Sequence, residues 1–303
     1  MSLSNDLKVS REYEMKTYLS SMDALYDNAI ISNGEIYDIA SSLTNKFSNI
    51  NAEAVLTDSR IIKTLRYSVA PTISQMKFGQ FFGINSIGKF ENDKLSAGTE
   101  NHKALKKIAD SVAKFATDNL DKSRFIWIDA ELSKSEKVLA SEYAKKWTCS
   151  LAADQNAQTK YRNWRKDQQE HAVAGELVKM GYVKSTFTGI VSCDTDINVG
   201  EYTQELKVQG RTRQKADLIV RSKKTRKLVL IEAKAVGVEI DSTKRIKECC
   251  DKSNDWRAGA SIGSPDVITV IAGFFTETGI KNLTASNVSV VWEHRLKDLS
   301  KLL

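Results

Sequence analysis

Asp217, Glu232 and Lys234 have the residue types and the spacing to hold a metal ion beside an ammonium group. They belong to two apolar runs, Ala216–Val220 and Leu228–Ile231, which a polar and basic break, RSKKTRK, separates. Two carboxylates can bind a Mg²⁺ ion that keeps several of its waters. An adjacent lysine can then orient or deprotonate one water for in-line attack on a phosphodiester. These residues therefore predict metal-dependent hydrolysis of a phosphodiester.

Two paired strands must bring these groups together. Asp217 lies near the start of the first run and Glu232 ends the second, as in two strands joined by a short loop. Glu232 and Lys234 point to the same face of a strand because side chains alternate with a period of two. A solvated strand edge with a cross-strand ion pair is the alternative. The continuous apolar run LVLI favours a strand buried on both faces, which does not end in two charges without a partner or a metal.

The array Asp217-x14-Glu232-x-Lys234 resembles the PD-(D/E)xK nuclease superfamily, which is most familiar from type II restriction endonucleases. The resemblance implies that Asp217 and Glu232 bind the metal and that the carbonyl oxygen of Ala233 is a third ligand. It also implies that Lys234 is the catalytic lysine. One departure is visible, since Ala216 stands where the superfamily motif has Pro.

A further acid lies on a predicted helix, Tyr161–Met180, which Gly181 ends. One face of this helix carries residues at i, i+3, i+4 and i+7: Glu170, Val173, Ala174 and Leu177. The spacing resembles the first helix of many PD-(D/E)xK nucleases, whose glutamate approaches the metal site. The resemblance therefore implies a catalytic role for Glu170, with Glu176 as the less favoured acid because it lies on another face. A glutamate on the helix surface is the alternative.

Cysteine and histidine offer no metal site of their own. The four cysteines have no CxxC spacing, and the three histidines are far apart in the chain, which excludes a local zinc or HNH-like motif. We therefore expect reduced thiols and a metal held by carboxylates. Mg²⁺ is the expected ion, and Mn²⁺ can substitute for it.

The positive charge of the chain gathers around the candidate acids. The net charge is +7, and the segment from Glu205 to Arg257 holds 15 Lys and Arg against 8 Asp and Glu. Such a segment would draw a polyanion such as double-stranded DNA to the site. The residues expected to contact DNA are Arg211, Arg213, Lys244, Arg245, Lys247 and Arg257. A merely solvated basic face is the alternative.

Hydrophobic periodicity predicts an α/β fold, with a mixed central sheet flanked by helices and a mainly helical N-terminal half. Residues 1–150 are the expected helical region and the candidate part for DNA recognition and dimerisation. Its predicted elements are helices over Glu12–Asp27, Gly34–Phe47, His102–Leu120 and Leu132–Lys146, breaks at Asn33-Gly34 and Asn92–Gly98, and a short strand over Phe125–Asp129. Three of its aromatic residues, Phe78, Phe81 and Phe82, are expected in a core.

Residues 151–303 are the expected catalytic core. Besides the strands around Asp217 and Glu232, the predicted strands are Phe187–Cys193, Tyr202–Val208, Val267–Phe275 and Val288–His294. A helix capped by Asp241 or Ser242 is expected through Trp256, with Lys252 on its basic surface. Two further helices are expected over Glu277–Thr284 and Arg295–Leu303.

The function expected from these features is that of a Mg²⁺-dependent type II restriction endonuclease acting as a homodimer on double-stranded DNA. A structure-specific or phage-type nuclease and a non-catalytic DNA-binding protein are the alternatives. Incubation with plasmid DNA and Mg²⁺ separates the three, as discrete bands, structure-dependent nicks or binding alone. We expect no ATP, since GxxxxGK[ST] is absent, and no membrane; the polar N-terminus predicts a cytoplasmic protein.

Overall fold

The computed structural model describes residues 2–259 and 262–303. The chain forms two compact units. The first, here called the sheet unit, comprises Met1–Ser21 and Tyr161–Leu303, and the second, the helical unit, comprises Met22–Lys160. Two long helices, α1 (Leu3–Leu43) and α7 (Lys134–Lys179), contribute residues to both units. Within the described part of the chain, no helix combines the length and the apolar character needed to cross a membrane.

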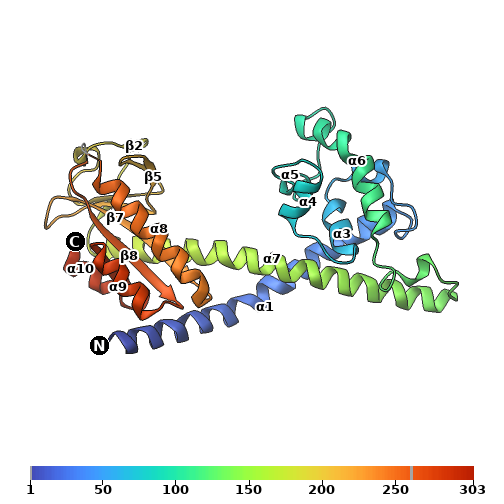
Figure 1. Ribbon diagram of the computed structural model, residues 1–303, viewed down its shortest axis with the longest axis horizontal. Coiled ribbons are helices and arrows are strands. Elements are labelled where there is room, and N and C mark those ends of the chain that lie inside the picture. Colours follow the sequence, from blue (N-terminus) through green and yellow to red (C-terminus); the bar gives the residue numbers. More distant parts are fainter. Residues whose placement is uncertain (1, 260–261) are drawn as a thin grey trace. The chain divides into compact units, whose positions relative to one another are not determined.

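A mixed six-stranded sheet forms the centre of the sheet unit, and Figure 1 labels two of its strands, β7 and β8. The strand order is β1-β3-β6-β7-β8-β9. Its strands are β1 (Val183–Lys184), β3 (Glu201–Gln204), β6 (Leu218–Arg221), β7 (Leu228–Val236), β8 (Asp266–Gly273) and β9 (Val288–Trp292). β6 runs antiparallel to β7, whereas β7, β8 and β9 are parallel. A second, three-stranded sheet contains β2 (Ile190–Val191), β4 (Lys207–Gln209) and β5 (Arg213–Lys215).

Helices cover both faces of the larger sheet, and the side chains of β7 show how. Leu228 and Leu230 belong to a core with residues of α8 (Glu239–Arg257) and α9 (Glu277–Ala285). Val229 and Ile231 belong to a second core with α7 and α10 (Leu299–Leu302). This alternation is what a strand buried on both faces requires. Two short 3₁₀ helices, η2 (Asp194–Asp196) and η3 (Glu293–Asp298), complete the unit.

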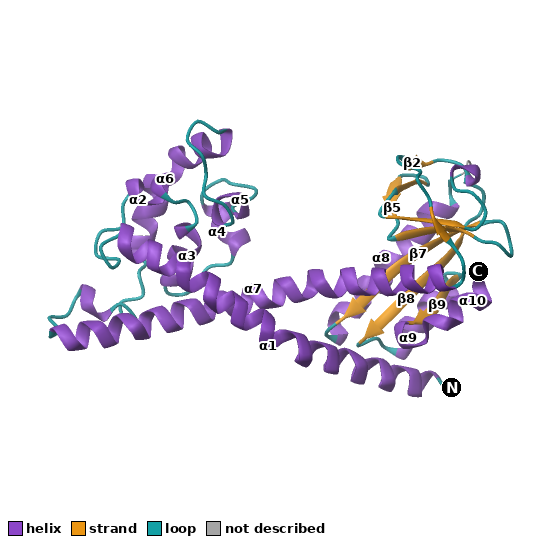
Figure 2. Cartoon of the chain, turned by 180° about the vertical axis from the view of Figure 1, so that it is seen from behind, coloured by secondary structure: helices purple, strands orange, loops and turns teal. Residues whose placement is uncertain are grey.

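The helical unit contains no sheet strand (Figure 2). It is built around one apolar core. Besides parts of α1 and α7, its elements are α2 (Ala52–Thr57), α3 (Ile61–Ser68), α4 (Gln75–Phe81), α5 (Gly88–Glu91), α6 (Glu100–Asp118) and the 3₁₀ helix η1 (Ile126–Ile128). Phe78 is buried in the core and Phe82 packs against it, as expected. Phe81 is 53% exposed, so the expectation that it is a core residue is wrong.

The predicted fold class is confirmed: the protein is α/β, with a mixed sheet flanked by helices and a mainly helical N-terminal half. The antiparallel pair β6 and β7 is also as predicted. The break at Asn33-Gly34 is wrong, because α1 continues through it. Asn33 is buried and accepts a hydrogen bond from Asn156 at 3.4 Å. Packing within the helical unit thus outweighs the local preference for a turn.

Three other predicted boundaries differ from the structure. The segments Leu132–Lys146 and Tyr161–Met180 are not separate helices but parts of α7. The predicted strand Phe125–Asp129 is η1, where buried Phe125 packs against Phe47 and Trp127 instead of pairing with a strand. α8 begins at Glu239 with Val238 as its N-cap, so neither Asp241 nor Ser242 caps it.

Two further predicted elements of the sheet unit are only partly present in the structure. Of the predicted strand Phe187–Cys193, only Ile190–Val191 pairs, and it pairs with β4 of the small sheet. The predicted closing helix Arg295–Leu303 is divided between η3 and α10, because the backbone of Arg295 leaves the helical region.

Candidate functional site

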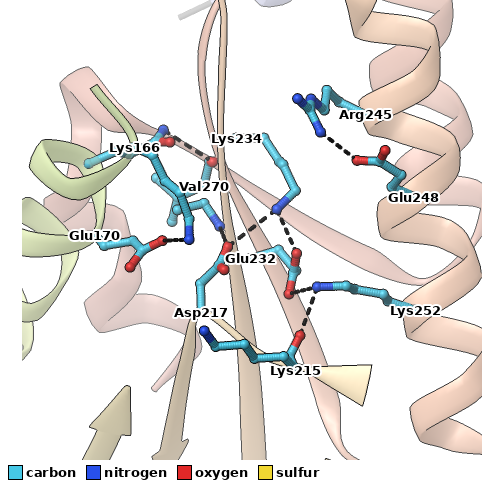
Figure 3. A network of polar contacts seen from close by, with 12 residues as sticks. Lys166, Glu170, Lys215, Asp217, Glu232, Lys234, Arg245, Glu248, Lys252 and Val270 are labelled. Carbon is cyan, nitrogen blue, oxygen red and sulfur yellow. Dashed lines mark hydrogen bonds and ion pairs between the residues drawn. The ribbon is translucent and has the colours of Figure 1, made fainter. Parts of the chain in front are cut away.

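The pairing of β6 with β7 brings Asp217, Glu232 and Lys234 together (Figure 3). Leu218 is opposite Ile231, so Asp217 lies beside the strand position that Glu232 occupies. The ammonium nitrogen of Lys234 is 3.3 Å from Asp217 Oδ2 and 2.6 Å from Glu232 Oε2. The backbone N–H of Ala233 also donates to Asp217 Oδ2, at 2.9 Å. Two buried carboxylates therefore share one lysine.

Lys234 is positively charged at neutral pH in this arrangement. Burial opposes the charged form, but the charges of Glu232 and Asp217 outweigh it and raise the pKa of Lys234 above its ordinary value. The side chain is 14% exposed. A lysine in this state can donate hydrogen bonds and neutralise developing negative charge, whereas it has no free lone pair to accept a proton.

Glu232 has a second lysine partner, Lys252, which comes from α8. Lys252 Nζ is 2.8 Å from Glu232 Oε1 and 2.7 Å from the carbonyl oxygen of Lys215. Glu232 is completely buried, and each of its carboxylate oxygens accepts from one ammonium group. Two positive charges thus offset the cost of burying this carboxylate.

A group of three acids lies next to this pair: Glu170, Glu205 and Asp217 offer carboxylate oxygens within 4.8 Å of one another. Glu170 extends from α7 and is buried. Its pKa is raised, chiefly by burial and then by the charge of Asp217, while Lys166 acts in the opposite direction. Glu205 lies in the turn between β3 and β4, where its backbone N–H donates to the carbonyl oxygen of Asp217 at 3.0 Å.

These three acids fit a hard divalent cation. All the donors are carboxylate oxygens, the ligands that Mg²⁺ prefers. Glu170 Oε1 is buried and forms an ion pair with Lys166 at 3.2 Å. A divalent cation at the three acids would take over this contact from the ammonium group.

The structure therefore groups the predicted acids in a way that the sequence did not show. Asp217 belongs to both groups, Glu170 joins the three-acid group, and Glu232 lies between the two lysines. Glu205 was not predicted, because it reaches the site through the pairing of β3 with β6 and no short motif contains it. Glu176, the alternative acid on the same helix, pairs instead with Lys179 at 3.2 Å.

The basic residues expected to contact DNA occupy two elements. Arg211 and Arg213 are exposed on the β4–β5 hairpin. α8 anchors this hairpin, because Asp255 accepts hydrogen bonds from the backbone N–H groups of Arg211 and Thr212, both at 2.9 Å.

α8 itself carries the other four basic residues. Lys244, Arg245 and Lys247 are exposed, and Arg245 pairs with Glu248 at 2.9 Å. Arg257 is half-buried, and its guanidinium donates to the carbonyl oxygens of Ser286 and Asn287 at 2.9 and 2.6 Å. Arg257 therefore stabilises the turn that follows α9.

Comparison with known proteins identifies the family of this chain. No curated protein matches the chain. Among solved structures, protein VC1899 from Vibrio cholerae matches with a TM-score of 0.25 and 11% identity, over 92% of this chain and 55% of that one, so the chain spans about half of its length. Likeness at this level carries no argument about the site. The family model for the XamI restriction endonuclease matches residues 45–292, which include every acid and lysine of the site. The chain therefore belongs to the XamI restriction endonuclease family.

Proposed function

We propose that this chain is a Mg²⁺-dependent type II restriction endonuclease that cleaves double-stranded DNA at a specific sequence. Membership of a restriction endonuclease family supports the assignment as a nuclease that acts on DNA, and such enzymes generally use a divalent metal ion. The observation that carries the finer proposal is the contact of Lys234 with Asp217 and Glu232, beside the group of three acids.

Each acid has a proposed role. Asp217, Glu170 and Glu205 would hold the metal ion through carboxylate oxygens. Glu232 and the carbonyl oxygen of Ala233 would be the further ligands that the superfamily motif implies. Glu232 also holds Lys234 in place through their 2.6 Å contact. A bound Mg²⁺ would supply an activated water and a Lewis acid at the phosphate.

Lys234 acts on the reacting phosphate as a charged donor. Its raised pKa keeps it protonated, so it orients the attacking water and stabilises charge that develops on the phosphate oxygens. Its buried carboxylate partners restrict where the ammonium can lie, which reduces the reorganisation needed during the reaction.

DNA binding is assigned to the exposed basic residues of the two elements that border the acids. Arg211 and Arg213 lie on the hairpin, and Lys244, Arg245 and Lys247 lie on α8. Arg257 is left out of this set because backbone carbonyl oxygens hold its guanidinium. The helical unit, which contains most of residues 1–150, is assigned to sequence recognition and dimerisation, since a compact unit of its size is more than catalysis requires.

Replacement of one lysine tests the proposal. With Mg²⁺ and plasmid DNA, the wild type should give discrete fragments, and EDTA should abolish them. Lys234→Ala should cut about 100 to 1,000 times more slowly, the usual effect of removing one donor that stabilises the transition state. Its affinity for DNA in Ca²⁺, measured by gel shift, should stay close to that of the wild type.

Lys227→Ala is the matched control, because Lys227 is an exposed lysine just before β7 and lies outside the acid cluster. It should cut at the wild-type rate. Normal cutting by Lys234→Ala would show that the active site lies elsewhere, and binding without cutting by the wild type would favour a non-catalytic DNA-binding protein.

A further inference from the structure

A lysine side chain lies among the acids that fit a metal ion. Lys166 is one helical turn before Glu170 on α7. Its ammonium nitrogen is 3.2 Å from Glu170 Oε1 and 3.0 Å from Glu205 Oε1. These are two of the three acids in the proposed metal site, so Lys166 supplies positive charge where the ion would supply it. Figure 3 shows its contact with Glu170 beside Asp217.

We propose that, before a metal ion binds, the ammonium group of Lys166 occupies the position of the ion between Glu170 and Glu205. When the ion binds, the displaced ammonium group then contacts a phosphate of the DNA. This inference rests on the proposed function, because it assumes that Glu170, Glu205 and Asp217 are the metal ligands. It assigns to Lys166 a role that neither the superfamily motif nor the basic segment around Asp217 contains.

Exposure and contacts together make Lys166 the lysine that can leave. Its side chain is 49% exposed and that of Lys215 is 48% exposed, compared with 14% for Lys234 and 25% for Lys252. Lys166 contacts both Glu170 and Glu205, whereas Lys215 contacts Glu205. Its ion pair with Glu205 is exposed at both ends and contributes little free energy. Its pair with the buried Glu170 is one that a divalent ion can replace, because the ion carries the larger charge. The four-carbon stem of lysine lets the ammonium move several ångströms without any change in the helix.

The charge balance of the site gives the direction of this movement. Four carboxylates, Glu170, Glu205, Asp217 and Glu232, contact four ammonium groups, Lys166, Lys215, Lys234 and Lys252. The cluster is therefore close to neutral without an ion. A divalent ion adds two positive charges, which repel the nearby exposed ammonium groups and favour a polyanion beside them.

Metal binding in the absence of DNA tests the first part of the proposal, that Lys166 occupies the position of the metal ion. We would measure Mn²⁺ affinity by electron paramagnetic resonance for the wild type, Lys166→Met and Lys179→Met. Lys166→Met should bind Mn²⁺ about 3 to 10 times more tightly, because the ion no longer competes with the two ion pairs of Lys166. Lys179 is the matched control, since it lies on the same helix and its exposed pair is with Glu176, outside the cluster. Its replacement should leave the affinity unchanged.

DNA binding in saturating Ca²⁺ tests the second part of the proposal, that the displaced Lys166 contacts a phosphate. Lys166→Met should bind DNA more weakly than the wild type, and the slope of log affinity against log salt should become less steep by about 0.9, the value for one lost phosphate contact. Lys179→Met should keep the wild-type slope. A slope that is unchanged in Lys166→Met overturns the phosphate contact.

The outcomes separate this inference from the proposed function. Equal Mn²⁺ affinity in the wild type and Lys166→Met, with normal DNA cleavage by the wild type, overturns the role of Lys166 and leaves the nuclease in place. A wild type that neither binds Mn²⁺ nor cleaves DNA overturns both. Asp217→Asn provides the check that Mn²⁺ is bound at the acids, since it should abolish the binding.

Discussion

At the scale of single residues, the buried carboxylate of Glu232 requires positively charged partners. A carboxylate with no exposed surface is expensive to bury, and the protein offsets that cost with Lys234 on one oxygen and Lys252 on the other. Lys252 also donates to the carbonyl oxygen of Lys215, at the end of β5. It thus links α8, β7 and the basic hairpin through one ammonium group.

We expect Lys252→Met to slow cleavage at saturating DNA by about tenfold or more, because Glu232 loses one of the two contacts that fix it. DNA affinity should change little. Urea unfolding should show a loss of about 1–3 kcal/mol, the cost of an unsatisfied buried acceptor. Single-turnover assays measure the change in cleavage rate, and binding assays measure the DNA affinity.

Lys281→Met is the control, since it removes an exposed lysine that pairs with Glu277 on α9. It should match the wild type in rate and stability. Wild-type cleavage by Lys252→Met would mean that Glu232 needs only Lys234.

The sequence predicted the part of the site that lies within one pair of strands. The spacing of Asp217, Glu232 and Lys234 was enough, because alternation along β7 and one antiparallel pairing determine their distances. Glu205 and Lys252 enter through β3 and α8, whose positions depend on the packing of the whole sheet unit. No local spacing contains that information.

At the scale of elements, a buried ionic network joins three segments of the sheet unit. Arg165 of α7 donates from Nε to Glu14 of α1 at 2.9 Å, and from its two terminal nitrogens to Glu293 of η3 at 3.1 and 2.9 Å. All three residues are buried, and Tyr161 donates to the other oxygen of Glu14. The network is one of the contacts that hold the first residues of the chain in the sheet unit, a placement that periodicity in the sequence does not indicate.

We expect Arg165→Met to destabilise the protein by about 3–5 kcal/mol, because it leaves two carboxylates buried without their cation. Chemical denaturation at neutral pH measures the loss.

Two variants show whether the network is responsible. Lys179→Met, on the same helix, removes only an exposed ion pair and should change stability by less than about 1 kcal/mol. Combining Arg165→Met with Glu14→Gln and Glu293→Gln should recover part of the loss. If the triple variant is no more stable than Arg165→Met, unpaired charge is not the cause.

At the scale of the whole molecule, the positive charge is concentrated in the segment that contains most of the candidate acids. The chain has a net charge of +7, and the segment from Glu205 to Arg257, which includes β4 to β7 and α8, holds an equal excess. This segment contains three of the site acids as well as the hairpin arginines. Phosphates would therefore be attracted to the surface that borders the acids.

One chain contributes one cluster of Asp217, Glu232 and Lys234, whereas a duplex has two strands to cut. Two chains related by a two-fold axis would place one cluster at each strand of a palindromic site, so we expect a homodimer on DNA.

Mixing wild type with Lys234→Ala before adding plasmid should give dimers with a single active cluster. These should nick one strand, and nicked circles should accumulate in proportion to the mixed dimers. The wild type alone should give linear DNA, and Lys234→Ala alone should give neither product. A mixture that yields linear DNA without excess nicked circles would contradict the dimer, as would sedimentation of one chain per duplex.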